Sequence, residues 1–234
     1  MKGSLFMIPT YLSETAPGES FPQKNLDIVS STRSFAVEEI RTARRFLKSV
    51  DRTIDIGTLT LTELNEHHGV ADIPKILSAT ESGENVGMIS EAGCPGVADP
   101  GAELAAEAHR RGIRVVPLVG PSSIILGLMA SGLNGQNFAF SGYLPIGAEL
   151  PKHLRKMEER SMKENQTQIF IEAPYRNDKM LHALLQTLRP TTRLCVARSV
   201  TGADELISTK SVEEWRKSQL PELHKKPTVF LFLA

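Results

Sequence analysis

The chain has 234 residues, of which 41% are hydrophobic and 23% are charged, so it is long enough for one large or two small globular domains with a real core. Lysine plus arginine and aspartate plus glutamate number 27 each, which excludes a global positive field that would gather nucleic acid. The two cysteines, Cys94 and Cys195, lie far apart, which is neither a disulfide framework nor metal-ligand spacing.

In the first half of the chain, short apolar segments alternate with amphipathic ones. We expect strands at residues 4–8, 26–30, 53–59, 85–90 and 113–119, and helices at residues 34–50, 73–83 and 102–112. The segment 34–50 leaves open a short strand at its start, residues 34–37. This alternation, with continuous apolar strands, predicts a parallel sheet covered by helices on both faces.

The second half has more β character per residue, which suggests a different architecture. We expect helices at residues 122–133, 151–165, 178–190 and 211–219, and strands at residues 137–145, 167–173, 192–200 and 227–234. No segment approaches the roughly 18 consecutive apolar residues of a membrane span, so we expect a cytoplasmic protein without a membrane anchor.

The segment ISEAGCPGVADPGAEL, residues 89–104, packs glycines and prolines between an expected strand and an expected helix. It would lie at the carboxyl edge of the sheet, where open α/β folds bind ligands. Gly93 and Gly96 let the backbone approach a ligand closely, and Asp99 can cap the helix that follows. The alternative is a tight turn between strand and helix, which Pro-Gly pairs commonly mark.

A second loop repeats this arrangement. The segment PLVGPSSIILGLMASGL at 117–133 holds Gly120, Pro121 and paired serines at the start of a helix. Two helix N-termini with free N–H groups and hydroxyls can converge on one polar ligand. Neither a Gly-Lys-Ser/Thr phosphate loop nor a G-x-G-x-x-G dinucleotide fingerprint is present, which argues against a nucleotide phosphate.

Four motifs in order carry a family resemblance. SEAGCPGVADPG, VVPLVGPSSI, GYLP at 142–145 and IEAPYR at 171–176 resemble the motif series of the tetrapyrrole methylase superfamily of S-adenosylmethionine-dependent methyltransferases. They are most similar to the branch that methylates the 2′-hydroxyl of a cytidine in small-subunit ribosomal RNA. The resemblance runs from about residue 35 to about residue 176, and the last strand fits more loosely.

The resemblance implies two α/β domains, the methyl donor in the cleft between them, and a homodimer. The domains would be residues 1–117, with a parallel sheet, and 118–234, with a mixed sheet; composition alone would place the boundary near Pro145. By motif position the residues expected to contact S-adenosylmethionine are Ala92, Gly93, Cys94, Val97, Ser122, Ser123 and Glu172.

The sequence also departs from the family pattern. The loop PTYLSETAPGES at 9–20 holds only Gly18 where the family is glycine-rich. Glu91 stands where the ribosomal RNA branch has aspartate, and Glu38 and Glu39 precede Ile40 and Arg41 where that branch has a glutamate-aspartate pair before threonine-arginine. These differences indicate a divergent subgroup.

Methyl transfer to a hydroxyl requires alignment of the reacting atoms and removal of a proton. Glu39, Glu66 and His67 are candidate bases, and a solvated surface carboxylate is the alternative for each glutamate. His67 and His68 are adjacent and diverge in direction, so we expect no metal site.

Arg41, Arg44, Arg45 and Lys48 have helical spacing and would form a basic stripe able to contact RNA phosphates, or simply a solvated helix face. Tyr175 and Arg176 follow a strand and can bind a phosphate or carboxylate, or stabilise a turn. We therefore expect 2′-O-methylation of ribosomal RNA. The alternatives are methylation of a small molecule such as a tetrapyrrole, and a non-catalytic donor-binding protein.

Overall fold

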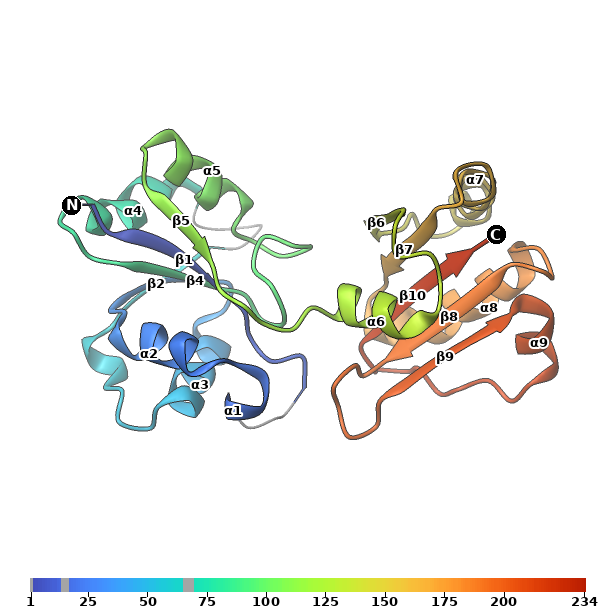
Figure 1. Cartoon of the computed structure of the whole chain (residues 1–234), viewed down its shortest axis with the longest axis horizontal. Helices are drawn as coiled ribbons and strands as arrows, with labels where there is room; N and C mark the ends of the chain where they lie inside the picture. Colours follow the sequence, from blue (N-terminus) through green and yellow to red (C-terminus); the bar gives the residue numbers. More distant parts are fainter. Residues whose placement is uncertain (1, 14–16, 65–69) are drawn as a thin grey trace. The chain divides into compact units, whose positions relative to one another are not determined.

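The computed structural model describes residues 2–13, 17–64 and 70–234 and divides the chain into two compact units, Met1–Ser122 (unit 1) and Ser123–Ala234 (unit 2) (Figure 1). The division falls after Ser122, inside the second of the two loops singled out in the sequence, and each unit has its own five-stranded sheet.

Unit 1 contains a parallel sheet with the strand order β3-β2-β4-β1-β5. The strands are β1 Ser4–Ile8, β2 Ser34–Val37, β3 Thr60–Glu63, β4 Val86–Ile89 and β5 Arg114–Pro117. Every residue of the central strand β4 is buried, because helices cover both faces of the sheet, and this explains its continuous apolar run. Ile8 and Val37 both pair with Ile89, so β1, β2 and β4 end side by side.

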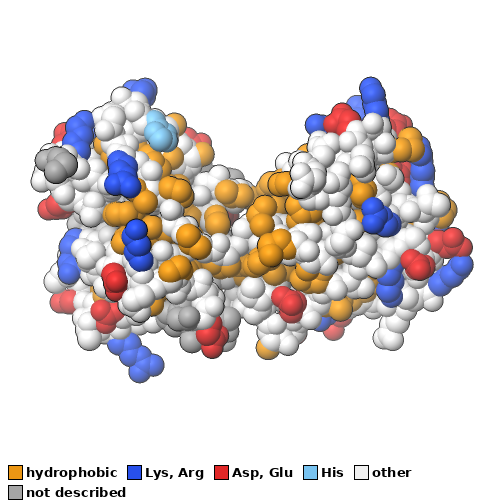
Figure 2. Space-filling view, viewed as in Figure 1, with side chains coloured by type: hydrophobic (Ala, Val, Ile, Leu, Met, Phe, Trp, Pro, Cys, Tyr) orange, Lys and Arg blue, Asp and Glu red, His pale blue; other side chains and the backbone are white. Residues whose placement is uncertain are grey.

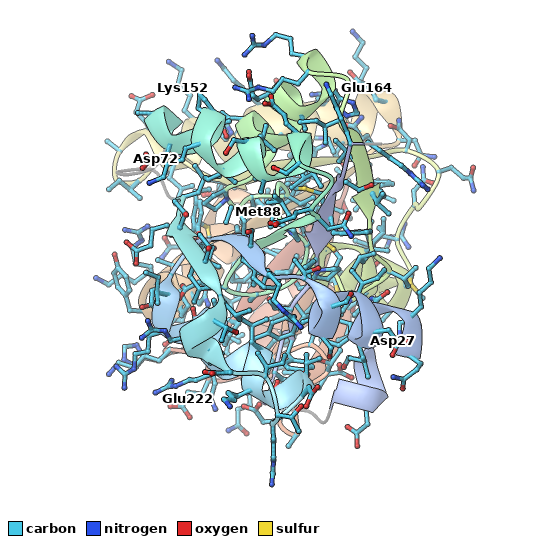
Figure 3. The ribbon with its side chains drawn as sticks, turned by 90° about the vertical axis from the view of Figure 1, so that its left-hand side faces the viewer. Asp27, Asp72, Met88, Lys152, Glu164 and Glu222 are labelled. Carbon is cyan, nitrogen blue, oxygen red and sulfur yellow. The ribbon has the colours of Figure 1, made fainter. Side chains whose placement is uncertain are left out.

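Helices cover both faces of this sheet (Figure 1). On one side are α1 Pro17–Ser20, α2 Gln23–Ser31 and α3 Ile40–Val50, and on the other α4 Ile73–Glu81 and α5 Ala102–Arg110, with single turns η1 Ile56–Thr58 and η2 Val70–Asp72. Two buried clusters result, one containing Phe35 and Leu47, the other Leu77 and Met88. In Figure 3, Met88 lies in the interior of unit 1, and Asp27 and Asp72 lie at its periphery.

Unit 2 contains a mixed sheet with the order β6-β7-β10-β8-β9, in which only the β6–β7 pair is parallel. The strands are β6 Phe138–Tyr143, β7 Thr167–Ile171, β8 Arg193–Arg198, β9 Leu206–Ser211 and β10 Thr228–Leu233. The helices are α6 Ser123–Ser131, α7 Glu149–Glu164, α8 Asn177–Thr187 and α9 Val212–Lys217, with a turn η3 at Pro174–Arg176. Leu154, Leu184 and Trp215 bring α7, α8 and α9 into one buried cluster with Phe230 of β10.

The α/β class is confirmed, as is the short strand at the start of 34–50, which is β2. The expected strand at 26–30 is wrong, because those residues belong to α2, whose Asn25 and Val29 are buried one helical turn apart; a short apolar run does not distinguish strand from helix. The expected strand at 53–59 is also wrong, because this segment contains the 3-10 turn η1 and the strand β3 begins only after it. Strand β9 was not expected, because every residue of this edge strand is half-buried and its polar sequence shows no alternation.

Candidate functional site

The loop between β4 and α5, residues 90–101, follows one of two neighbouring strands whose next helices lie on opposite faces of the sheet. Neighbouring strands β1 and β4 are followed by helices on opposite faces, α2 after β1 and α5 after β4 (Figure 1). At such a switch point the loops separate and leave a crevice at the carboxyl edge, which is where open α/β sheets bind ligands. The position predicted from the sequence for this loop is therefore confirmed. We call residues 90–101 the site loop.

Hydrogen bonds hold the site loop to the strands on both sides. Towards β1, the Thr10 N–H donates to the Gly93 carbonyl at 2.9 Å and the Thr10 hydroxyl donates to the Ser90 carbonyl at 3.3 Å. Towards β2, the Glu91 N–H donates to the Glu38 carboxylate at 2.9 Å. These hydrogen bonds hold the loop in place, which reduces the entropy that it loses on binding a ligand.

Glycines allow this path. Gly93 is buried with φ of 78°, and a Cβ there would lie 3.3 Å from Leu12 and 3.7 Å from the Pro121 carbonyl. Gly101 has φ of 128° and is itself the N-cap of α5, without a side-chain hydrogen bond to the helix. The expectation that Asp99 caps α5 is therefore wrong.

The loop after β5 contacts the loop after β1 and the site loop within unit 1. A Cβ on Gly120 would lie 2.4 Å from the Cβ of Pro9, so the Pro9 ring packs against the Gly120 backbone only because residue 120 has no side chain. The Cys94 thiol donates to the Pro121 carbonyl at 3.5 Å. Three loops, after β1, β4 and β5, therefore meet at one edge of the sheet.

The residues expected to contact the donor differ in exposure. Ala92 and Val97 are exposed, Gly93 is buried, and Ser122 and Ser123 are half-buried at the end of unit 1 and the start of unit 2. Burial, and secondarily Asp99, raises the pKa of the Cys94 thiol, which keeps it protonated at neutral pH and unsuited to nucleophilic attack.

Acidic side chains gather around the site loop. Burial first, then the negative charge of Glu38, raises the pKa of Asp99 from 3.8 to about 6; Glu91 adds to this and the Ser90 hydroxyl opposes it. The sequence reasoning missed this environment because Glu38 follows a different strand, and only the pairing of β2 with β4 brings it near.

Glu39 caps helix α3. Its carboxylate accepts the backbone N–H groups of Arg41 at 2.8 Å and Thr42 at 2.6 Å. These hydrogen bonds lower the pKa of Glu39, which makes it a weaker proton acceptor. The contacts of Glu39 are those of a helix cap and give no support to a role as base. The other candidates, Glu66 and His67, lie outside the described residues.

Helix α3 carries the predicted basic stripe, which we define as Arg41, Arg44, Arg45 and Lys48. All four side chains are exposed, and none forms an ion pair with any residue that the structure describes. The stripe begins beside the site loop, because the Thr42 hydroxyl on the first turn lies 3.4 Å from the Glu91 carboxylate. On the face drawn in Figure 2, positive and negative side chains are interspersed.

In unit 2, Glu172 follows β7 and is only 5% exposed. It accepts hydrogen bonds from its neighbour Ala173 N–H at 2.6 Å and from the Arg176 guanidinium at 2.5 Å. Arg176 also lies 5.1 Å from the ring centroid of Tyr175, which is 60% exposed. The contacts of Arg176 are those of a structural turn, and Tyr175 is the member of this group that projects into solvent.

Residues 2–13, 17–64 and 70–234 contain neither a candidate membrane-spanning helix nor a candidate metal site. No helix there has both the length and the apolar character that crossing a bilayer requires. No group of three or more histidine, cysteine or acidic side chains there is arranged to hold a metal ion.

Comparison with known proteins identifies relatives. The profile of the family described as Tetrapyrrole (Corrin/Porphyrin) Methylases matches residues 24–215. Proteins named Ribosomal RNA small subunit methyltransferase I are similar over most of the chain. The relative from Vibrio cholerae is 30% identical over 90% of this chain and 69% of its own length. The relative from Mesorhizobium japonicum is 32% identical over 89% of this chain and 67% of its own length. The relative from Bacillus subtilis is 30% identical over 94% and 69%.

Two solved structures share the fold. The crystal structure of the methyltransferase CobJ superposes with a TM-score of 0.64 at 19% identity, over 99% of this chain and 94% of its own. The uroporphyrin-III-C-methyltransferase from Thermus thermophilus superposes with a TM-score of 0.57 at 18% identity, over 100% and 93%.

Proposed function

The chain belongs to the tetrapyrrole (corrin/porphyrin) methylase family, and from this premise we propose that it transfers a methyl group from S-adenosylmethionine to a 2′-hydroxyl of ribosomal RNA. As a member of this family the chain is a methyltransferase. The basic stripe is the observation that carries the choice of RNA, because four cations without an ion-pair partner among the described residues lead away from the site loop along one exposed helix face. The names of the relatives support the same substrate.

The residues of the site loop suit a cationic donor. S-adenosylmethionine supplies an electrophilic methyl group on a positively charged sulfur. A side chain at Gly93 would press against Leu12 and the Pro121 carbonyl, so only glycine keeps this close-packed backbone free for a ligand. The carboxylates of Glu38, Glu91 and Asp99 provide negative charge nearby. The proposed donor contacts remain those of the family resemblance: Ala92, Gly93, Cys94, Val97, Ser122, Ser123 and Glu172.

The proposed role of the chain in catalysis is orientation and proton transfer. Holding nucleophile and methyl carbon in line is worth up to about 7–11 kcal/mol in well-aligned systems. The pre-formed site loop provides a rigid base for such alignment, and phosphates bound by Arg41, Arg44 and Arg45 would fix the RNA strand beside it. Tyr175 is proposed as a further substrate contact because its ring is exposed.

Charge reversal on the stripe tests the choice of substrate. The double variant Arg44→Glu/Arg45→Glu should abolish methylation of ribosomal RNA and leave donor affinity unchanged, because neither side chain belongs to the site loop. Arg114→Glu, an exposed cation at the start of β5 and so at the opposite edge of the sheet, is the matched control and should keep RNA methylation. Equal RNA methylation by the double variant and the wild type would contradict RNA binding by the stripe.

Methylation of a small molecule such as a tetrapyrrole is the second candidate, and the family description favours it. In that case the double variant would keep its turnover. We also propose a cytoplasmic homodimer, which light scattering after gel filtration would test by giving about twice the 25.7 kDa of one chain.

A further inference from the structure

The basic stripe has a fixed starting point at the site loop. Glu38 follows β2, and its carboxylate accepts the Glu91 N–H of the site loop at 2.9 Å. The next residue, Glu39, caps α3, and the Thr42 hydroxyl on the first turn of this helix lies 3.4 Å from the Glu91 carboxylate. Neighbouring residues of an extended chain point in opposite directions, so Glu38 holds the site loop while Glu39 holds the helix. The first cation of the stripe, Arg41, therefore lies beside the site loop.

The topology of the sheet sets the direction of the stripe. Strands β2 and β3 pair in parallel, with Ser34 opposite Thr60, so the chain has to return from the carboxyl edge to the amino edge between them. Helix α3 makes this return along one face of the sheet (Figure 1). Its buried side chains, Ala43, Phe46 and Leu47, pack towards the sheet, and the stripe occupies exposed positions. The cations thus lead from the site loop towards the amino edge of the sheet.

The guanidinium groups of the stripe are free to bind a ligand. The side chains of Arg41, Arg44 and Arg45 form neither a hydrogen bond nor an ion pair with any residue that the structure describes. The ammonium group of Lys48 donates to the Arg52 carbonyl at 3.0 Å. An arginine offers five N–H donors in a planar fork that matches a phosphate, and a lysine adds a point charge. A chain of phosphates is therefore the ligand that uses the whole stripe.

The stripe is one helix face wide. Its members are three or four positions apart, which places neighbours about 5–6 Å from each other. On α2, which packs beside α3, the exposed charged side chains are Lys24 and Asp27, and the turn η1 after α3 exposes Asp55. Neither of these described elements supplies a second row of cations. A duplex presents two phosphate backbones, so a single row suits one unpaired strand.

The length of the stripe limits how much of a strand it can hold. Arg41 and Lys48 are seven residues apart, which is about 10 Å along the helix axis. A stacked strand advances about 3.4 Å for each phosphate, so about three consecutive phosphates fit between the two ends of the stripe. Because the stripe begins at the site loop and leads only away from it, these phosphates lie on one side of the reacting nucleotide.

We propose that the basic stripe binds one unpaired RNA strand and holds about three consecutive phosphates on one side of the methylated nucleotide. In this arrangement Arg41 contacts the phosphate nearest to that nucleotide, Arg44 and Arg45 contact the middle one, and Lys48 contacts the farthest. This inference rests on the proposed function, which puts the donor at the site loop. The choice of ribosomal RNA alone leaves open both the form of the strand and the order of its contacts.

The test is phosphate-ethylation interference with the full chain and small-subunit ribosomal RNA, whose methylated nucleotide is first located with the wild type. Sparsely ethylated RNA is incubated with protein and S-adenosylhomocysteine, and the ethylated positions missing from the bound fraction are mapped. The positions that depend on the stripe should be about three consecutive phosphates on one side of the methylated nucleotide. A complementary oligonucleotide annealed over those nucleotides should weaken binding by the wild type to the level of Arg44→Ala/Arg45→Ala.

Alanine variants assign the contacts. Exposed helix positions accept alanine without loss of helix propensity, so these variants should fold like the wild type, which circular dichroism checks. Arg41→Ala should lose interference at the nearest phosphate, Arg44→Ala/Arg45→Ala at the middle one and Lys48→Ala at the farthest. The slope of log affinity against log salt should become shallower by about 0.7 for each phosphate contact removed. Arg114→Ala, at the opposite edge of the sheet, is the matched control and should keep the pattern and the slope.

The opposite results are distinct. Stripe-dependent positions on both sides of the methylated nucleotide, or in an order that does not follow the helix, overturn this path of the RNA, while methylation by the wild type leaves the proposed function standing. The same holds if the annealed duplex binds as well as the unpaired strand, or if Arg114→Ala removes the pattern. A wild type that binds S-adenosylmethionine and leaves ribosomal RNA unmethylated overturns the proposed function, and the path of the RNA with it.

Discussion

Replacement of Asp99 by asparagine should stabilise unit 1 at neutral and higher pH. The folded-state pKa of about 6 lies above the ordinary value of 3.8, so the folded protein binds the proton more tightly than the unfolded chain. Asp99 therefore contributes stability that is complete below about pH 3.8 and is lost as the pH rises through about 6. Above that pH the ionised carboxylate lowers the free energy of unfolding relative to a neutral side chain of the same shape.

The magnitude follows from the same difference. At 1.36 kcal/mol for each pH unit, the change from 3.8 to about 6 corresponds to at most about 3 kcal/mol. The carboxyl group is partly exposed and solvent screens it, so we reduce this to about 1–2 kcal/mol. Asp99→Asn should raise the free energy of unfolding by that amount at about pH 8 and leave it unchanged at about pH 3.5.

The assay has to follow unit 1. Trp215, the chain's single tryptophan, lies in unit 2, so its fluorescence does not report on the site loop. Hydrogen exchange of the amides of β1 and β4, measured at both pH values, does. Asp27→Asn on the surface of α2 is the control and should change little (Figure 3). If Asp99→Asn is less stable than the wild type at about pH 8, or has the same effect at both pH values, the ionised Asp99 carboxylate does not destabilise the folded protein and the reasoning is wrong.

Two other substitutions test the packing of each unit. Gly120→Ala would place a Cβ 2.4 Å from Pro9, and this overpacking should lower the free energy of unfolding by about 1–3 kcal/mol and weaken donor binding. Urea unfolding followed by circular dichroism measures the loss of stability. Unchanged stability would show that the loops do not touch. Glu158→Ala would remove a carboxylate that is 3% exposed and leave the Arg189 N–H and the Thr192 hydroxyl without their acceptor, so tryptophan fluorescence should show unit 2 destabilised by about 3–5 kcal/mol. A loss below about 1 kcal/mol would show that water replaces it.

The sequence was sufficient to predict features that depend on neighbouring residues. The continuous apolar run of β4 indicated a strand covered on both faces, and the glycines and prolines after it indicated the site loop. The basic stripe was also predictable, because helical spacing alone places Arg41, Arg44 and Arg45 on one exposed face of α3.

Features that depend on strand pairing were not predictable. Glu38 and Glu91 are 53 residues apart, and only the parallel pairing of β2 with β4 brings Glu38 next to Glu91 and Asp99 in the site loop. A single sequence shows neither that pairing nor the burial that raises the pKa of Asp99. Glu39 illustrates the reverse case, because a glutamate before a helix was considered as a base and is a helix cap.

The most direct test of the proposed function is transfer of an isotopically labelled methyl group from S-adenosylmethionine to unmodified small-subunit ribosomal RNA, with mass spectrometry of the released nucleosides. We expect one labelled 2′-O-methylated nucleoside with the wild type and none with Gly93→Trp, whose side chain would be forced against Leu12 and the Pro121 carbonyl. Calorimetry should show micromolar binding of the donor by the wild type alone. A folded wild type that binds the donor and leaves the RNA without label would contradict the proposal.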